Sequence, residues 1–76
     1  MSNSIEKQPG RHPGTVQLLG WFDYSHLPDH LQAVSRPLHD LAHEVASQLP
    51  DGPELTTGLR KLLEAKDCFV RAAVAA

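Results

Sequence analysis

PELTTGLRKLLEAKDCFVRAAVAA, residues 53–76, is the most strongly patterned stretch of the chain. A helix turns by about 100° per residue, and at that angle the side chains of this stretch sort into three faces. The apolar face holds Leu55, Leu59, Leu62, Leu63, Phe69, Val70 and Ala73. The opposite face holds the charged Arg60, Glu64, Asp67 and Arg71, and a third holds the small Gly58, Ala65 and Ala72. The stretch therefore predicts an amphipathic helix over residues 53–75.

A second helical pattern precedes this one, over residues 28–49. Its apolar residues recur at three- and four-residue steps and form a one-sided stripe suited to a single partner helix. The stripe holds Leu31, Val34, Leu38, Leu41, Ala42, Val45 and Leu49. Pro28 suits a first helical turn, whereas Pro37 removes a backbone donor inside the helix. We therefore expect a kink at Pro37 or a restart near Ser35.

The two patterns are joined by Pro-Asp-Gly-Pro, residues 50–53. Pro50 ends the first helix, Asp51 and Gly52 reverse the chain, and Pro53 opens the second helix. A connection this short makes the two helices antiparallel neighbours. The expected fold is all-α, an antiparallel two-helix hairpin with its domain at residues 21–76.

Residues 1–20 contain two Pro-Gly pairs and little apolar weight, which indicates a flexible arm. A short strand from Thr15 to Leu19 is an alternative for part of it. Trp21 and Phe22 follow, and we expect them to form an extended aromatic segment on the helices. They serve there either as core anchors or as stacking partners for a ligand.

The composition limits the classes of function. A chain of 76 residues forms one small domain, which buries only about 60% of its unfolded surface and often depends on self-association. A net charge of −2 argues against long nucleic acid as a partner. There is no signal peptide and no apolar run that could span a bilayer, so we expect a cytoplasmic protein with no membrane partner. The single Cys68 forms no internal disulfide or zinc knuckle and is expected to be inert.

The hairpin alone leaves apolar surface uncovered, because one narrow stripe cannot cover both the apolar and the small-residue faces of the second helix. We therefore expect a homo-oligomer, since small residues let another helix approach closely. The expected interface residues are Gly58, Leu62, Ala65, Phe69 and Ala72. The alternative is that the aromatic segment folds back over this surface.

Lys66 falls in the middle of the apolar face, where an unpaired ammonium is costly. Its stem can pack while the charge reaches water, or the charge can pair with Asp40 or Glu44 of the first helix. A third possibility is that Lys66 meets a ligand phosphate where subunits join. The sequence leaves these three readings open.

Histidines occur at i, i+4 spacing in two pairs, His39–His43 and His26–His30. This spacing is found in two-histidine zinc sites, but no His-Glu-x-x-His motif and no cysteine pair supports one here. Solvated surface histidines explain both pairs more simply. Neither a nucleophile–base pair nor a phosphate-binding glycine loop is present, so we expect no enzyme, no metal and no cofactor.

Several short motifs occur in a recognisable order: Phe22-Asp23-Tyr24, His26 and Pro28, then Leu41-Ala42, a proline-bearing turn, Glu54, Leu59, Leu62, Glu64-Ala65 and Ala72-Ala73. Over residues 22–73 the chain resembles the helical-hairpin domain shared by phage anti-CBASS and anti-Thoeris sponge proteins. In that family an aromatic-x-Tyr-His-x-Pro segment leads into a two-helix hairpin whose second helix has a Leu-Glu-x-Ala register.

The resemblance implies a non-enzymatic oligomer, located in the cytoplasm of an infected bacterial host. It implies that the protein holds a cyclic nucleotide or a cyclic ADP-ribose-type immune signal in pockets between subunits, which starves the host effector. Phe22 and Tyr24 would then stack on a base or shape the pocket, and Arg36, Arg60 or Lys61 would meet phosphates. His26 and Lys66 complete the expected ligand-binding set.

The chain also departs from the family pattern. The early Arg-Tyr-x-x-Ile-Arg run of the family corresponds here to residues 30–36, HLQAVSR, and its late tryptophan-asparagine stretch to residues 67–71, DCFVR. These differences leave the identity of the ligand open. The alternative function is a helical protein–protein interaction module of a phage or bacterial assembly.

Overall fold

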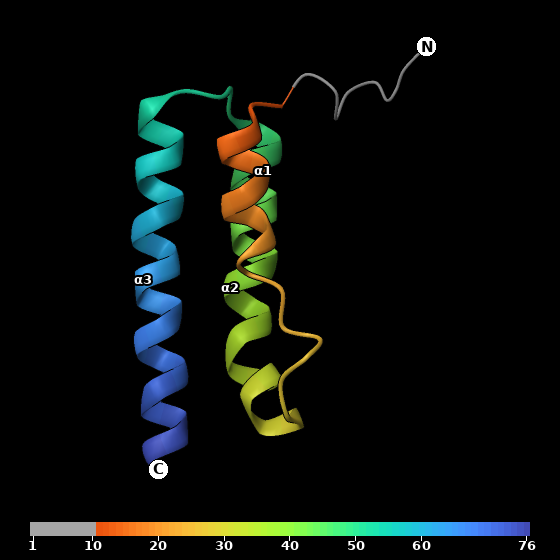
Figure 1. Cartoon of the computed structure of the whole chain (residues 1–76), viewed down its shortest axis with the longest axis vertical. Coiled ribbons are helices and arrows are strands. Elements are labelled where there is room, and N and C mark those ends of the chain that lie inside the picture. The colour runs from red at the N-terminus through yellow and green to blue at the C-terminus, as the bar shows by residue number, and fades with distance from the viewer. Residues whose placement is uncertain (1–10) are drawn as a thin grey trace.

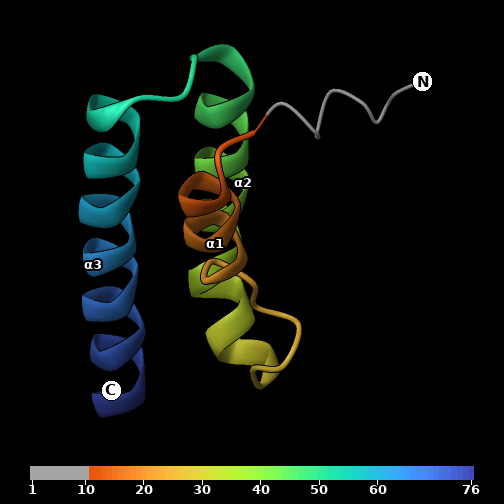
Figure 2. The same cartoon turned by 45° about the horizontal axis from the view of Figure 1, so that its top comes forward.

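In a computed structural model, which describes residues 11–76, three helices pack together (Figure 1). They are α1 (Pro13–Gly20), α2 (Asp29–Gln48) and α3 (Pro53–Ala75). α2 and α3 run antiparallel and are joined by a short turn, and α1 contacts both (Figure 2). The predicted all-α class is confirmed, and within the described residues there is no strand. The expected two-helix hairpin is present, with a third helix added to it.

The two long helices have nearly the predicted bounds. α3 spans Pro53–Ala75 as expected, and α2 spans Asp29–Gln48 against the predicted 28–49. α2 continues through Pro37 without interruption, so the predicted restart near Ser35 is wrong. The carbonyl that loses its partner belongs to Ala33, which is exposed, so water is available to it. The kink angle at Pro37 stays a prediction.

The first helix corrects the interpretation of residues 1–20 as a flexible arm. Pro13 to Gly20 are helical, so the alternative of a strand from Thr15 to Leu19 is also wrong. The His12 side chain caps the helix by accepting a hydrogen bond from the Gly14 N–H at 2.9 Å. Thr15 and Leu18 are buried, which anchors the helix on its neighbours. The rest of the predicted arm, residues 1–10, lies outside the described residues.

The core centres on Phe22, whose exposed fraction is 0%. It lies in the turn that follows α1 and packs in one cluster with Leu18 of α1, Ala42 of α2 and Leu59 of α3. Trp21, the preceding residue, is 51% exposed. The expected extended aromatic segment is therefore a tight turn that leaves the Trp21 ring outside and places the following Phe22 ring inside.

A polar latch ties the start of α1 to the α2–α3 turn. Arg11 pairs with the Asp51 carboxylate at 2.6 Å, and the His12 backbone N–H donates to the same carboxylate at 2.7 Å. Arg11 also donates to the carbonyl oxygens of Ala46 and Leu49, which satisfies acceptors left free at the end of α2. The hydrogen bond from His12, and then that from Arg11, lowers the pKa of Asp51 below its ordinary value.

Candidate functional site

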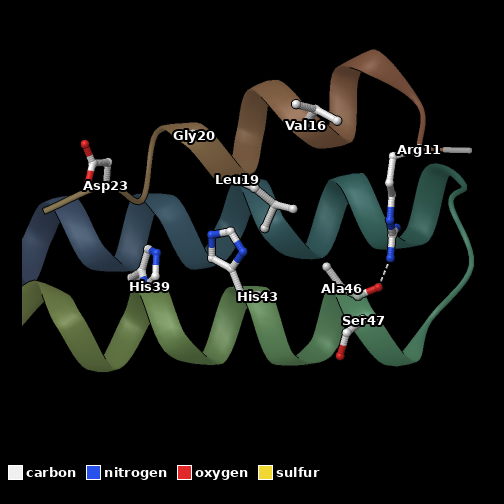
Figure 3. A pocket seen from close by; sticks show the side chains of 9 residues that line it. All are labelled: Arg11, Val16, Leu19, Gly20, Asp23, His39, His43, Ala46 and Ser47. Carbon is white, nitrogen blue, oxygen red and sulfur yellow. Dashed lines mark hydrogen bonds between the residues drawn. The ribbon is translucent and has the colours of Figure 1, made fainter. Parts of the chain in front are cut away.

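A pocket of about 450 Å³ lies along the seam between α1 and α2 (Figure 3). The α1 side is apolar and is formed by Val16, Leu19 and Gly20. The α2 side carries the polar His39, His43 and Ser47 together with Ala46, and Arg11 and Asp23 lie at opposite ends in Figure 3. The seam thus joins an apolar wall to a wall of imidazoles.

The polar wall continues into an aromatic–basic cluster of Tyr24, Arg36, His39 and His43. The His39 and His43 ring centroids are 4.3 Å apart, and the edge-on Tyr24 ring lies 5.0 Å from the His39 ring. The Arg36 guanidinium carbon lies 5.6 Å from the Tyr24 ring centroid. Arg36, His39 and His43 share one face of α2, because helical residues three and four positions apart are neighbours.

Neighbouring groups set the charges around this cluster. His39 Nδ1 lies 2.9 Å from the Asp40 carboxylate. Partial burial, and secondly the proximity of His39, lowers the pKa of His43, which favours its neutral form. A hydrogen bond from the Ser25 backbone N–H lowers the pKa of Asp23, which is therefore ionised. Of the two arginines near the pocket, Arg11 is paired with Asp51. Arg36 forms no ion pair with any residue in 11–76.

The predicted ligand-binding residues do not converge on one place. Tyr24 and Arg36 meet in the aromatic–basic cluster. His26 and Lys66 line a different pocket of about 560 Å³, beside Trp21. Arg60 lines a third pocket of about 260 Å³, and Lys61 is exposed on α3.

Phe22 confirms the core-anchor reading of the aromatic segment and corrects the assignment of this ring to ligand stacking. Its side chain is fully buried in the core, so it cannot stack on a base. The reason is that the turn after α1 directs this ring toward Leu18 and Leu59, which a reading of the segment as extended does not anticipate. Of the two rings assigned to the ligand, only the half-buried Tyr24 has a surface to offer.

Lys66 forms an ion pair with its neighbour in sequence. Its Nζ lies 3.1 Å from the Asp67 carboxylate, and its side chain is 13% exposed. The predicted partners, Asp40 and Glu44, are therefore wrong. The stem is largely covered while the charge pairs at the protein surface, which relieves the cost that the sequence indicated.

The predicted interface residues differ in exposure. Gly58, Phe69 and Ala72 are exposed, whereas Leu62 and Ala65 are half-buried. Gly58 and Leu62 line an apolar groove of about 300 Å³, which is formed by α2 and α3 with no residue from α1. The other lining residues are Leu41, Val45, Leu49, Glu54, Leu55 and Leu59. The aromatic segment does fold back onto the apolar face of α3, where Phe22 packs in the core cluster with Leu59, so that alternative is confirmed for this face. No residue of the segment lines the groove beside Gly58, which stays open.

His39 and His43 are the site residues that the sequence did not assign to a ligand. Their i, i+4 spacing is visible in the sequence, but the contact of His39 with Tyr24 involves a segment outside the helix. Arg36 lies one turn earlier on the same face of α2, and its presence beside the two histidines is a second sequence signal for a site there. Across residues 11–76, no three or more His, Cys, Asp or Glu side chains are placed to hold a metal ion together. No helix in this range is long and apolar enough to cross a membrane.

Comparison with known proteins assigns no family and no function to this chain. No protein-family model, curated protein or solved structure matches the chain. The function is therefore argued from the aromatic–basic cluster, from the apolar groove and from the motif resemblance of residues 22–73.

Proposed function

We propose that this protein is a non-enzymatic, homo-oligomeric sponge that binds and sequesters a cyclic nucleotide immune signal. The observation that carries the proposal is the aromatic–basic cluster, in which the half-buried Tyr24 ring lies 5.6 Å from the guanidinium carbon of Arg36 and 5.0 Å from the His39 ring. The cluster therefore combines a π-surface with cationic and hydrogen-bonding groups, as the recognition of a nucleotide requires.

Each group has a defined task in such a complex. Stacking of a base on an aromatic ring contributes about 1–3 kcal/mol and tolerates different bases. The guanidinium of Arg36 matches the geometry of a phosphate and donates two charge-assisted hydrogen bonds to it. His39 adds a ring nitrogen as donor or acceptor, and the neighbouring pocket of about 450 Å³ has room for part of a nucleotide.

The apolar groove supports the oligomeric part of the proposal. Leu41 is 46% and Leu49 is 50% exposed, and both border the groove that α2 and α3 form. A second copy that packs there removes this apolar surface from water, at roughly 25 cal/mol for each Å². Gly58 allows a close approach, since a Cβ added at this position meets no atom within 4 Å. Arg60, Lys61, His26 and Lys66 do not line this groove, so their contact with a ligand between subunits stays a prediction from the resemblance.

The polar groups of the pocket support binding rather than catalysis. Ser47, the hydroxyl in the pocket lining, donates to the Glu44 carbonyl oxygen at 2.7 Å. Cys68 is exposed on α3, where its sulfur accepts a hydrogen bond from Arg71 at 3.4 Å. A sponge needs no nucleophile, because it acts by lowering the free concentration of its ligand.

Isothermal titration of the full chain with cyclic di- and trinucleotides and cyclic ADP-ribose isomers tests the proposal. We expect saturable heat with at least one ligand, and recovery of that ligand chemically unchanged after denaturation. No heat with any member of the panel would overturn the proposal. Recovery of a linear or otherwise altered product would overturn the non-enzymatic part of it.

The apolar groove also favours a second candidate, a helical protein–protein interaction module of a phage or bacterial assembly. In this case a helix of another protein occupies the groove and the ligand titrations stay silent. A pull-down with the wild-type chain, beside a Leu41→Asp variant, distinguishes the two. A partner captured only by the wild type favours the interaction module, and self-association with nucleotide binding favours the sponge.

A further inference from the structure

The His39–His43 pair has the separation of a bidentate metal ligand. The two residues lie one turn apart on α2, and their ring centroids are 4.3 Å apart. An imidazole–metal bond of about 2.0–2.1 Å puts each ring centre roughly 3.2 Å from the ion. Two rings at adjacent positions of a square or octahedral ion then have centres roughly 4.5 Å apart, which agrees with the observed separation.

Two contacts prepare His39 for this task. Its Nδ1 faces the Asp40 carboxylate at 2.9 Å, and a proton shared there leaves the lone pair of Nε2 free for an ion. The Tyr24 ring meets the His39 ring edge-on and restrains its rotation. A carboxylate behind a ligating histidine orients the ring and raises its basicity. Both histidines also border the pocket of about 450 Å³, which has room for water ligands.

We propose that His39 and His43 form a two-imidazole chelate for a divalent transition metal, with water in the remaining positions and Cu²⁺ as the tightest-bound ion. The preference for Cu²⁺ follows from the order of stability of divalent metals on nitrogen ligands. The proposed site has two protein ligands only, since no group of three or more His, Cys, Asp or Glu side chains within residues 11–76 is placed to hold a metal ion. The proposal does not depend on nucleotide binding, because both imidazoles are in place without a nucleotide.

The chain contains a matched control for this site. His26 and His30 have the same i, i+4 spacing, but His26 lies before the start of α2. The spacing therefore places only the His39–His43 pair on one helical face. If spacing alone created the site, both pairs would bind equally well.

Titration of the full chain with CuCl₂, and separately with NiCl₂, in a non-coordinating buffer tests the proposal by calorimetry and by the visible absorption of Cu²⁺. We expect one ion per chain and at least a tenfold loss of affinity in His43→Asn and in His39→Asn. Asp40→Asn should weaken binding by about tenfold through its effect on His39. His30→Asn should bind like the wild type.

Circular dichroism first establishes that each variant keeps its helices. Binding that survives in the His39→Asn/His43→Asn double variant would overturn the proposal, and so would an equal loss in His30→Asn. Unchanged affinity in Asp40→Asn would overturn its positioning role. Since nucleotide is absent throughout, the result is distinguishable from a failure of the sponge function.

Discussion

Phe22 and Phe69 show how differently the two sides of the α2–α3 hairpin are treated. Where α1 and its following turn cover the hairpin, Phe22 is 0% exposed and forms the centre of the core. Where residues 11–76 provide no third element, Phe69 is 52% exposed and the groove beside Gly58 stays open. α2 and α3 have apolar residues on both sides of the hairpin. The two sides differ in exposure because α1 covers only one of them.

This contrast separates two tasks within one small domain. The covered side stabilises the chain and holds the aromatic–basic cluster at its edge. The exposed Leu41 and Leu49 of the groove contribute little to the stability of a single copy and are available for association, whereas Leu55 and Leu59 in its lining belong to the core. A change on the covered side should therefore alter folding, whereas a change at an exposed position of the groove should alter assembly.

Replacement of the two phenylalanines should give the largest difference between the sides. Phe22→Ala removes a fully buried ring, and we expect a loss of about 3–5 kcal/mol in the free energy of unfolding. Phe69→Ala should cost less than about 0.5 kcal/mol in the single chain. Urea denaturation followed by circular dichroism, at a concentration low enough to suppress association, measures both. Equal losses would break the distinction between the sides.

Changes in the aromatic–basic cluster should affect ligand binding without affecting assembly. Tyr24→Ala removes the stacking ring, and we expect a loss of about 1–3 kcal/mol, or about 5–150-fold in affinity. Arg36→Ala should weaken binding through the lost phosphate contact. Calorimetry measures both, with Arg71→Ala as a control that removes an exposed arginine from α3. An equal loss in Arg71→Ala would indicate a non-specific charge effect and contradict the proposed site.

Gly58→Ala should act in opposite directions on the chain and on the assembly. Alanine is about 1 kcal/mol more favourable than glycine inside a helix, and the added methyl group meets no atom within 4 Å in the single chain. The same methyl group obstructs the close approach of a second copy. Urea denaturation should show a more stable chain, and analytical ultracentrifugation should show weaker association. Unchanged association would place the interface elsewhere.

The polar latch between the start of α1 and Asp51 predicts a modest pH dependence of the free energy of unfolding. The pKa of Asp51 is lowered in the folded chain, mainly by the His12 N–H and secondly by Arg11. The contribution is therefore present above the unfolded-state pKa of about 3.9 and is lost as the pH falls through the folded-state value. Asp51→Asn should remove this component of the pH dependence. Urea denaturation at pH 7 and pH 3 measures it, and identical pH dependence in wild type and variant would contradict it.

The sequence predicts the hairpin well because local signals agree there. The apolar period sets both long helices, and Asp51-Gly52 between prolines sets the turn. α1 is different, because eight residues with two glycines do not form a helix without tertiary contacts. Burial of Thr15 and Leu18 supplies those contacts, and burial depends on the position of α3.

The candidate site is less predictable for the same reason. Tyr24 and Arg36 are visible in the sequence, but the contacts of Tyr24 with Arg36 and His39 require the turn after α1 to bring Tyr24 alongside α2. Phe22 illustrates the reverse error, since a motif position suggested a ligand contact and packing placed the ring in the core. The pairing of Lys66 with Asp67 is not anticipated either, because adjacent side chains on a helix do not normally face each other.

Native mass spectrometry of the full chain, purified from bacteria that produce cyclic nucleotide signals, tests assembly and ligand binding together. The proposed function predicts a multiple of the 8.3-kDa chain mass, with added mass that fragments as a cyclic nucleotide. The Tyr24→Ala variant should show the same multiple without the added mass. A monomer without added mass, from the wild-type chain under the same conditions, would contradict the proposed sponge function.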